Sequence, residues 1–232
     1  MAIKEITGID ECIFDFIYVA AMRDATMQLA YGGKDWKKTW LWYTAKETDK
    51  VKTVIQSIKD LLKGHILKIL SGEFDKNEAS KKDYSKALLV LAGEICKKIN
   101  DPEVNPNKNI KYAFTFGNAQ KLINMTVKYF YIATLGNDKK KAHFKYCHCP
   151  MDDQMLEKAW KNRIKAYKSW KASGEKGFKR SWSKESFNNN PEELPKRYAA
   201  FQDAVKELAD EKHISPIEYD YINWENKSPD KE

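Results

Sequence analysis

Apolar residues recur every three or four positions along most of this chain, which is the spacing of one face of an α-helix. In the first predicted helix, 9–30, the inward positions are Ile13, Phe16, Ile17, Ala20 and Ala21. A capping box at Thr44–Glu47 predicts a second helix to about Leu70, with an apolar face of Val51, Ile55, Ile58, Leu62, Ile66 and Ile69. A third helix is expected over 81–100, with a buried side of Leu88, Leu91, Ala92 and Ile95.

The second half of the chain continues this helical pattern after a break near 101–118, which holds Pro102 and Pro106. Further helices are expected over 119–135, 155–172, 191–211 and 215–224. The sequence thus predicts an all-α fold of about seven helices. We expect residues 1–225 to form a single two-lobed unit, with the break between the lobes, and residues 226–232 to form a disordered tail.

Composition agrees with a globular helical protein, because 42% of the residues are hydrophobic and the chain holds only 10 glycines and 7 prolines. No apolar run approaches the roughly 18 residues of a membrane-spanning helix, and no basic-then-apolar leader opens the chain. We therefore expect a cytoplasmic protein without a membrane partner. We also expect a monomer.

The net charge of +8 favours an anionic partner, with nucleic acid ahead of membrane. The most basic run, 158–184, holds ten Lys or Arg and one acid. A solvated helix face is more often balanced by Glu, so we favour a phosphate-facing surface that includes Lys161, Lys165 and Lys168. In 34–43, Trp36 and Trp40 alternate with lysines, which suits stacking on bases, although packing between helices is the more common use of such tryptophans.

The cysteines and histidines do not form a familiar metal motif. Cys147-His148-Cys149 is too tightly spaced for one tetrahedral zinc site, and no second pair of cysteines exists. We expect no metal and no cofactor. Cys147 and Cys149 are expected to alternate along an extended entry to Pro150, and His148 to line a cleft.

Candidate chemistry gathers between Thr115 and Asp153. Lys121 is expected in the first turn of a helix, and Asp152 opens another helix 31 residues later. A lysine nucleophile must be neutral to attack carbon, and a nearby carboxylate can stabilise positive charge on a sugar. The ordinary alternatives are a solvated lysine and a helix N-cap, and Asp153 competes with Asp152 for either role.

The residues of this region resemble the helix-hairpin-helix DNA glycosylase superfamily. The resemblance rests on the glycine turn Phe116-Gly117-Asn118, on Gln120-Lys121 at a helix start, and on Pro150-Met151-Asp152 opening the next helix. With Lys128 and Cys149 added, the pattern is most similar to the archaeal 8-oxoguanine DNA glycosylase branch. The match covers about forty of 232 residues and lacks the paired glycines usual in the hairpin.

The resemblance implies that Lys121 forms a Schiff base with the deoxyribose C1′ and that Asp152 assists departure of a flipped-out base. It also implies DNA contacts by the hairpin turn Phe116-Gly117-Asn118 and by Lys128. Supporting catalytic roles are assigned to Gln120, His148 and Asp153. The aromatic residues expected to line the base pocket are Trp36, Trp40 and Trp224.

Two functions follow as hypotheses. The first is a DNA glycosylase that excises a damaged or modified base from duplex DNA, with lyase activity at the abasic site if the imine forms. The second is a non-catalytic helical module that binds nucleic acid in a bacterial or phage defence or regulatory system.

Overall fold

The computed structural model describes residues 10–31, 49–74, 78–104, 114–161 and 193–225. Within these ranges the chain is all-α and contains no strand, which confirms the predicted fold class. The two-lobed arrangement of the glycosylase type stays a prediction. The expected tail at 226–232 lies outside the described residues.

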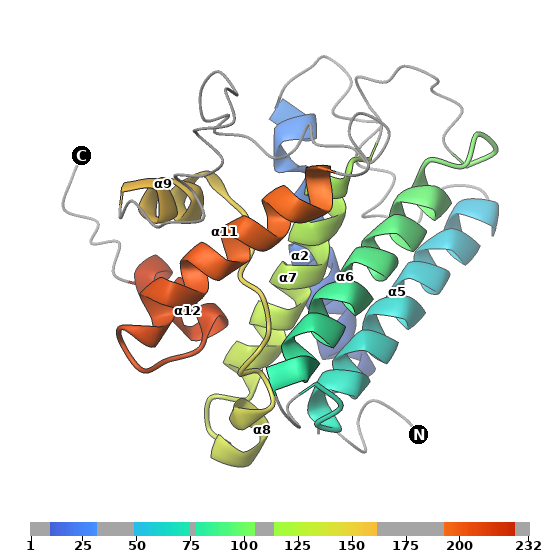
Figure 1. Cartoon of the computed structure of the whole chain (residues 1–232). Coiled ribbons are helices and arrows are strands. Elements are labelled where there is room, and N and C mark those ends of the chain that lie inside the picture. Colours follow the sequence, from blue (N-terminus) through green and yellow to red (C-terminus); the bar gives the residue numbers. More distant parts are fainter. Residues whose placement is uncertain (1–9, 32–48, 75–77, 105–113, 162–192, 226–232) are drawn as a thin grey trace.

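The described helices match most of the predicted ones in position (Figure 1). They are α2 (Glu11–Tyr31), α5 (Asp49–Leu70), α6 (Glu78–Ile99), α7 (Phe116–Ala133), α8 (Asp138–Ala142), α9 (Asp153–Lys161), α11 (Glu193–Asp210) and α12 (Pro216–Glu225). The sequence prediction missed α8, where a loop was expected. Its signals are Asn137, whose side chain accepts from Lys140 N at 3.1 Å, and an acidic first turn followed by lysines.

Helix α7 is the central element of the fold. It contacts α2, α5 and α6 on one side and α12 on the other (Figure 1). Fourteen of its 18 residues are buried, so it is enclosed nearly all round rather than along one stripe. Among the buried residues, Gln120, Asn124 and Lys128 follow each other at intervals of four and form a polar stripe inside the fold.

Helices α2, α5 and α6 pack the main apolar core with α7. The apolar faces predicted for α5 and α6 are buried as expected. The face predicted for α2 is wrong in part: Ile17 and Ala21 are buried, but Ile13 is 48% and Phe16 is 73% exposed. The reason is that α2 is apolar on more than one side, and neighbouring residues fill the core instead, namely Phe14, Tyr18 and Met22.

The opposite side of α7 is covered by α11 and α12, and by residues 147–151, a buried segment without regular secondary structure. α9 follows this segment and packs against α11. A buried irregular segment must find partners for its backbone groups inside the protein. Those partners come from α7 and α11, and they define the candidate site.

Candidate functional site

The start of α7 differs from the hairpin turn that the sequence predicts. Thr115 caps the helix, with Asn118 N donating to Thr115 Oγ1 at 3.2 Å and Thr115 N donating to Asn118 Oδ1 at 3.0 Å. Phe116, Gly117 and Asn118 form the first turn of the helix and are buried. The expected hairpin is therefore wrong at these residues, because this capping box draws them into α7 and burial denies them contact with a DNA phosphate.

Gln120 joins α7 to the segment before α9. Its Oε1 accepts from Met151 N at 3.2 Å, and its Nε2 donates to Met151 O at 3.3 Å and to Gly117 O at 3.0 Å. The side chain is completely buried, so water does not compete for these bonds. Because Lys121 and Asp152 are the next residues along the chain, this pairing brings the two parts of the chain that carry them together.

Lys121 lies in the second turn of α7, since the helix begins at Phe116 and not at the expected Ala119. Its side chain is half-buried, at the edge between the enclosed and open sides of the helix. It therefore remains accessible to a ligand. Among the described residues, no ion pair of 4.0 Å or less joins Lys121 to Asp152.

Asp152, and not Asp153, is the residue that caps α9. Asp152 Oδ1 accepts from Gln154 N at 3.1 Å and from Met155 N at 2.9 Å. Within the described part of the chain, Oδ2 accepts no hydrogen bond. The cap therefore fixes the carboxylate through one oxygen and leaves the other for a ligand. Asp153 is the first residue of α9, and its side chain lies outside the described residues.

A buried ion pair lies beside Asp152. Lys128 Nζ is 2.7 Å from Asp220 Oδ2, and both side chains are 4% exposed. The pKa of Asp220 is raised to about 6, chiefly by burial and in smaller part by the charge of Asp152, against the opposing effect of Lys128. Lys128 thus pairs with a carboxylate on α12, and the phosphate contact expected of it is wrong for this structure, because its ammonium group is enclosed.

His148 belongs to a buried polar network and does not line an open cleft as expected. Its Nε2 is 3.1 Å from Ser85 Oγ on α6, and its Nδ1 is 2.9 Å from Tyr198 Oη on α11. Asn124 on α7 donates to Tyr198 Oη at 3.0 Å and to Gln120 Oε1 at 3.1 Å. The network connects three helices to the 147–151 segment through the His148 side chain.

The remaining predicted site residues are described only in part or not at all. Lys161 ends α9 and Trp224 lies in α12, but their side chains lie outside the described residues. Trp36, Trp40, Lys165 and Lys168 lie wholly outside them. Their roles in base binding and phosphate binding stay predictions.

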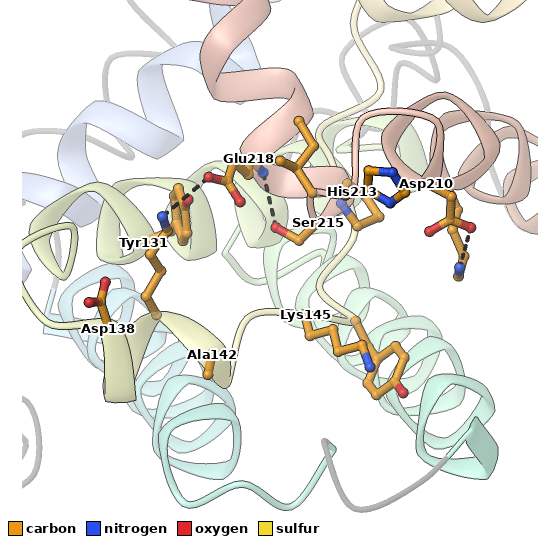
Figure 2. A pocket seen from close by; sticks show the side chains of 13 residues that line it. Tyr131, Asp138, Ala142, Lys145, Asp210, His213, Ser215 and Glu218 are labelled. Carbon is orange, nitrogen blue, oxygen red and sulfur yellow. Dashed lines mark hydrogen bonds and ion pairs between the residues drawn. The ribbon is translucent and has the colours of Figure 1, made fainter.

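Two cavities lie away from this region. One of about 450 Å³ sits at the end of α7, beside α8 and the start of α12, and Figure 2 shows Asp138 and Lys145 on either side of Ala142 there. Its lysines and carboxylates balance: Lys141 pairs with Glu218 at 3.2 Å and Lys206 with Asp210 at 2.5 Å. The lining thus favours neither an anion nor a cation. The other, about 1100 Å³, lies between α5 and α6.

Sequence reasoning missed Asp220 and Gln202. Both are polar residues on otherwise apolar helix faces: Asp220 lies three residues after buried Ile217, and Gln202 lies between buried Tyr198 and Val205. A polar residue at such a position must find a buried partner, so this pattern is the signal that could have found them.

Comparisons with protein-family models, curated proteins and solved structures found no match. Among the described residues, no group of three His, Cys, Asp or Glu side chains is arranged to hold a metal ion. None of the described helices is long and apolar enough to cross a membrane.

Proposed function

We propose that this protein is a DNA glycosylase in which Lys121 is the nucleophile and Asp152 stabilises the positive charge that develops on the sugar as the base departs. The observation that carries the proposal is the pairing of Gln120 with both backbone groups of Met151, at 3.2 and 3.3 Å. It fastens the residue before Lys121 to the residue before Asp152. The half-buried amine of Lys121 and the Asp152 carboxylate, whose Oδ2 accepts no hydrogen bond within the described residues, are thus carried by segments that lie side by side in the fold.

The proposed reaction uses both groups in sequence. The bond from C1′ to the base breaks, the electron pair leaves with the base, and the base takes up a proton from water. Asp152 Oδ2 stabilises the positive charge that develops on the sugar. The Lys121 amine reacts in its unprotonated form: it bonds to C1′ and loses one proton to the hydroxide that remains after water has protonated the base. The ring oxygen then leaves C1′ and takes the second N–H proton, which yields an imine. Loss of a C2′ proton to water permits β-elimination, in which the C3′–O bond breaks and the 3′ phosphate leaves with the electron pair.

DNA is the proposed partner because the substrate base must be extruded, at a cost of a few kcal/mol in stacking and pairing. Phosphate contacts have to offset that cost. The net charge of +8 and the basic run at 158–184 support such contacts. With the hairpin absent at 116–118 and Lys128 enclosed, we assign phosphate binding to the basic run, including Lys161, Lys165 and Lys168. We propose that a cytoplasmic monomer carries out this reaction.

Borohydride trapping tests the proposal. The wild-type protein, incubated with duplex oligonucleotides that each carry one modified base or an abasic site, is treated with borohydride. Reduction of an imine leaves the protein covalently bound to DNA. Lys121→Gln should abolish trapping, and the matched control Lys86→Gln should not, because Lys86 lies on the exposed side of α6 beside the α5–α6 cavity.

The panel also identifies the substrate, since the base that gives excision and trapping is the one recognised. Trapping that persists in Lys121→Gln would remove this lysine as the nucleophile. Salt-dependent DNA binding without excision or trapping on any oligonucleotide, the abasic one included, would favour the alternative, a non-catalytic nucleic-acid-binding module.

A further inference from the structure

The buried segment before Asp152 is held from two sides by glutamine side chains. Cys149 N donates to Gln202 Oε1 at 3.1 Å, and Gln202 Nε2 donates to Cys149 O at 2.9 Å. Gln120 makes the same pair of bonds to Met151. Each primary amide thus satisfies both backbone groups of one residue: its oxygen accepts from the N–H, and its nitrogen donates to the C=O.

Gln202 lies on α11 and Gln120 on α7, so the clamp spans the two helices that enclose the segment. Gln202 is 3% exposed. Pro150, between the two clamped residues, has no N–H to offer. The four bonds therefore fix the backbone up to the residue before Asp152.

From these contacts we propose that Gln202 is a positioning residue for the Asp152 carboxylate, an inference that rests on the proposed function. Asp152 uses Oδ1 to cap α9, and the direction of Oδ2 is therefore set by the backbone that enters the cap. Gln120 alone anchors only Met151. His148 is held through its side chain, by Ser85 and Tyr198, and that leaves the backbone groups of Cys149 to Gln202. Without Gln202, the N–H and C=O of Cys149 would lose their partners, and the backbone between His148 and Met151 would be free to shift relative to Lys121.

The test is the variant Gln202→Met, which keeps the length of the side chain and removes both hydrogen bonds. Single-turnover base excision should slow at least tenfold. Borohydride trapping at a ready-made abasic site should be retained, because no base has to depart there. In the Asp152→Asn background, Gln202→Met should cause no further loss of excision. The control is Gln56→Met on the exposed face of α5.

A purely structural role predicts a different result. Excision and abasic-site trapping would then fall together, in proportion to the folded fraction, and the effects of Gln202→Met and Asp152→Asn would multiply. Either result overturns the proposal. If Gln202→Met does not fold, Gln202→Glu serves: a protonated Glu can both donate and accept, so excision relative to wild type should recover as pH falls. No recovery in the folded variant would equally overturn the proposal.

Amide hydrogen exchange separates this inference from the proposed function. The N–H groups of Gln154 and Met155 donate to the Asp152 cap, and in Gln202→Met they should exchange at least tenfold faster relative to the amides of α6. Unchanged exchange overturns the positioning role, whatever the activity. If wild type neither excises nor traps while exchange accelerates in the variant, Gln202 positions Asp152 and the proposed chemistry fails.

Discussion

The buried ion pair between Lys128 and Asp220 gives a prediction with a definite pH dependence. The perturbation is Lys128→Met, which keeps an unbranched side chain and removes the charge. At pH 8 the Asp220 carboxylate, 4% exposed, would be left without its partner at 2.7 Å. Breaking a buried pair in this way typically costs about 3 to 5 kcal/mol of stability.

The cost should shrink at lower pH. The pKa of Asp220 is raised from 3.8 to about 6, chiefly by burial. The native protein therefore binds this proton more readily than the unfolded chain does. The stability from this titration is fully present below about pH 3.8 and is lost as pH rises through about 6. At pH 5 the carboxyl group is largely neutral in the native state, so removal of Lys128 should cost about 1 kcal/mol or less.

Urea unfolding followed by circular dichroism at pH 5 and pH 8 measures both values through the free energy of unfolding. The double variant Lys128→Met/Asp220→Leu has no buried charge at this site and should come within about 2 kcal/mol of wild type. The control is Lys206→Met, which breaks the exposed pair to Asp210 at 2.5 Å and should cost about 0 to 1 kcal/mol at either pH.

Two results would refute this reasoning. A cost for Lys128→Met below about 1 kcal/mol at pH 8 would mean that the pair is not effectively buried. An equal cost at pH 5 and pH 8 would mean that Asp220 does not titrate between them. If the variant were fully stable and only DNA affinity fell, Lys128 would contact phosphate after all.

Three further predictions concern other parts of the molecule. Asp152→Asn should keep α9 capped and change the free energy of unfolding by less than about 0.5 kcal/mol, because Asn caps about as well as Asp. It should nevertheless slow single-turnover base excision by a factor of about 10² to 10³, because the negative charge is lost. Excision at the wild-type rate would rule out a catalytic role for Asp152. Burial, and to a smaller extent the charge of Lys68, lowers the pKa of His65 from 6.5 to about 4. The neutral His65 therefore contributes stability that is fully present above pH 6.5 and is lost as pH falls through 4. The free energy of unfolding in urea should therefore fall less between pH 7 and pH 4 in His65→Phe than in wild type, by about 3 kcal/mol. An equal fall in both proteins would mean that His65 does not have a lowered pKa. His213 has φ 57°, a left-handed backbone conformation that strains residues with a Cβ but not glycine. His213→Gly should therefore raise the free energy of unfolding by up to about 1 kcal/mol and Tm by about 2 to 4 °C. An equal gain in His213→Ala, which keeps a Cβ, would contradict relief of backbone strain.

The sequence was sufficient where one periodic pattern decides the outcome. α5 has a single apolar stripe, and all six of its predicted buried positions are buried, together with His65 and Leu70. In α2 apolar residues occupy more than one side, so periodicity could not tell whether Phe16 or Tyr18 faces the core. That choice depends on the shape of α5 and α7, which is tertiary information.

In the candidate site, the sequence predicts features set by neighbouring residues but not contacts between distant parts of the chain. Lys121 and the Asp152 cap follow from local signals at helix starts. The burial of Lys128 depends on Asp220, which is 92 residues later, and the clamp on Cys149 depends on Gln202. No local pattern names these partners. The glycine turn expected at 116–118 is wrong because Thr115 and Asn118 form a capping box around Gly117, which places it in the first turn of α7.

The polar stripe of α7 also restricts how this helix can sit in the fold. An apolar helix enclosed on all sides could rotate about its axis with little change in buried area. Three polar contacts fix the rotation of α7 about its axis, because they form together in only one orientation: Gln120 with Met151, Asn124 with Tyr198, and Lys128 with Asp220. One residue inserted between Gln120 and Lys128 would turn the second half of α7 by about 100°. It would place an ammonium group against apolar helices, so α7 tolerates substitution far better than insertion.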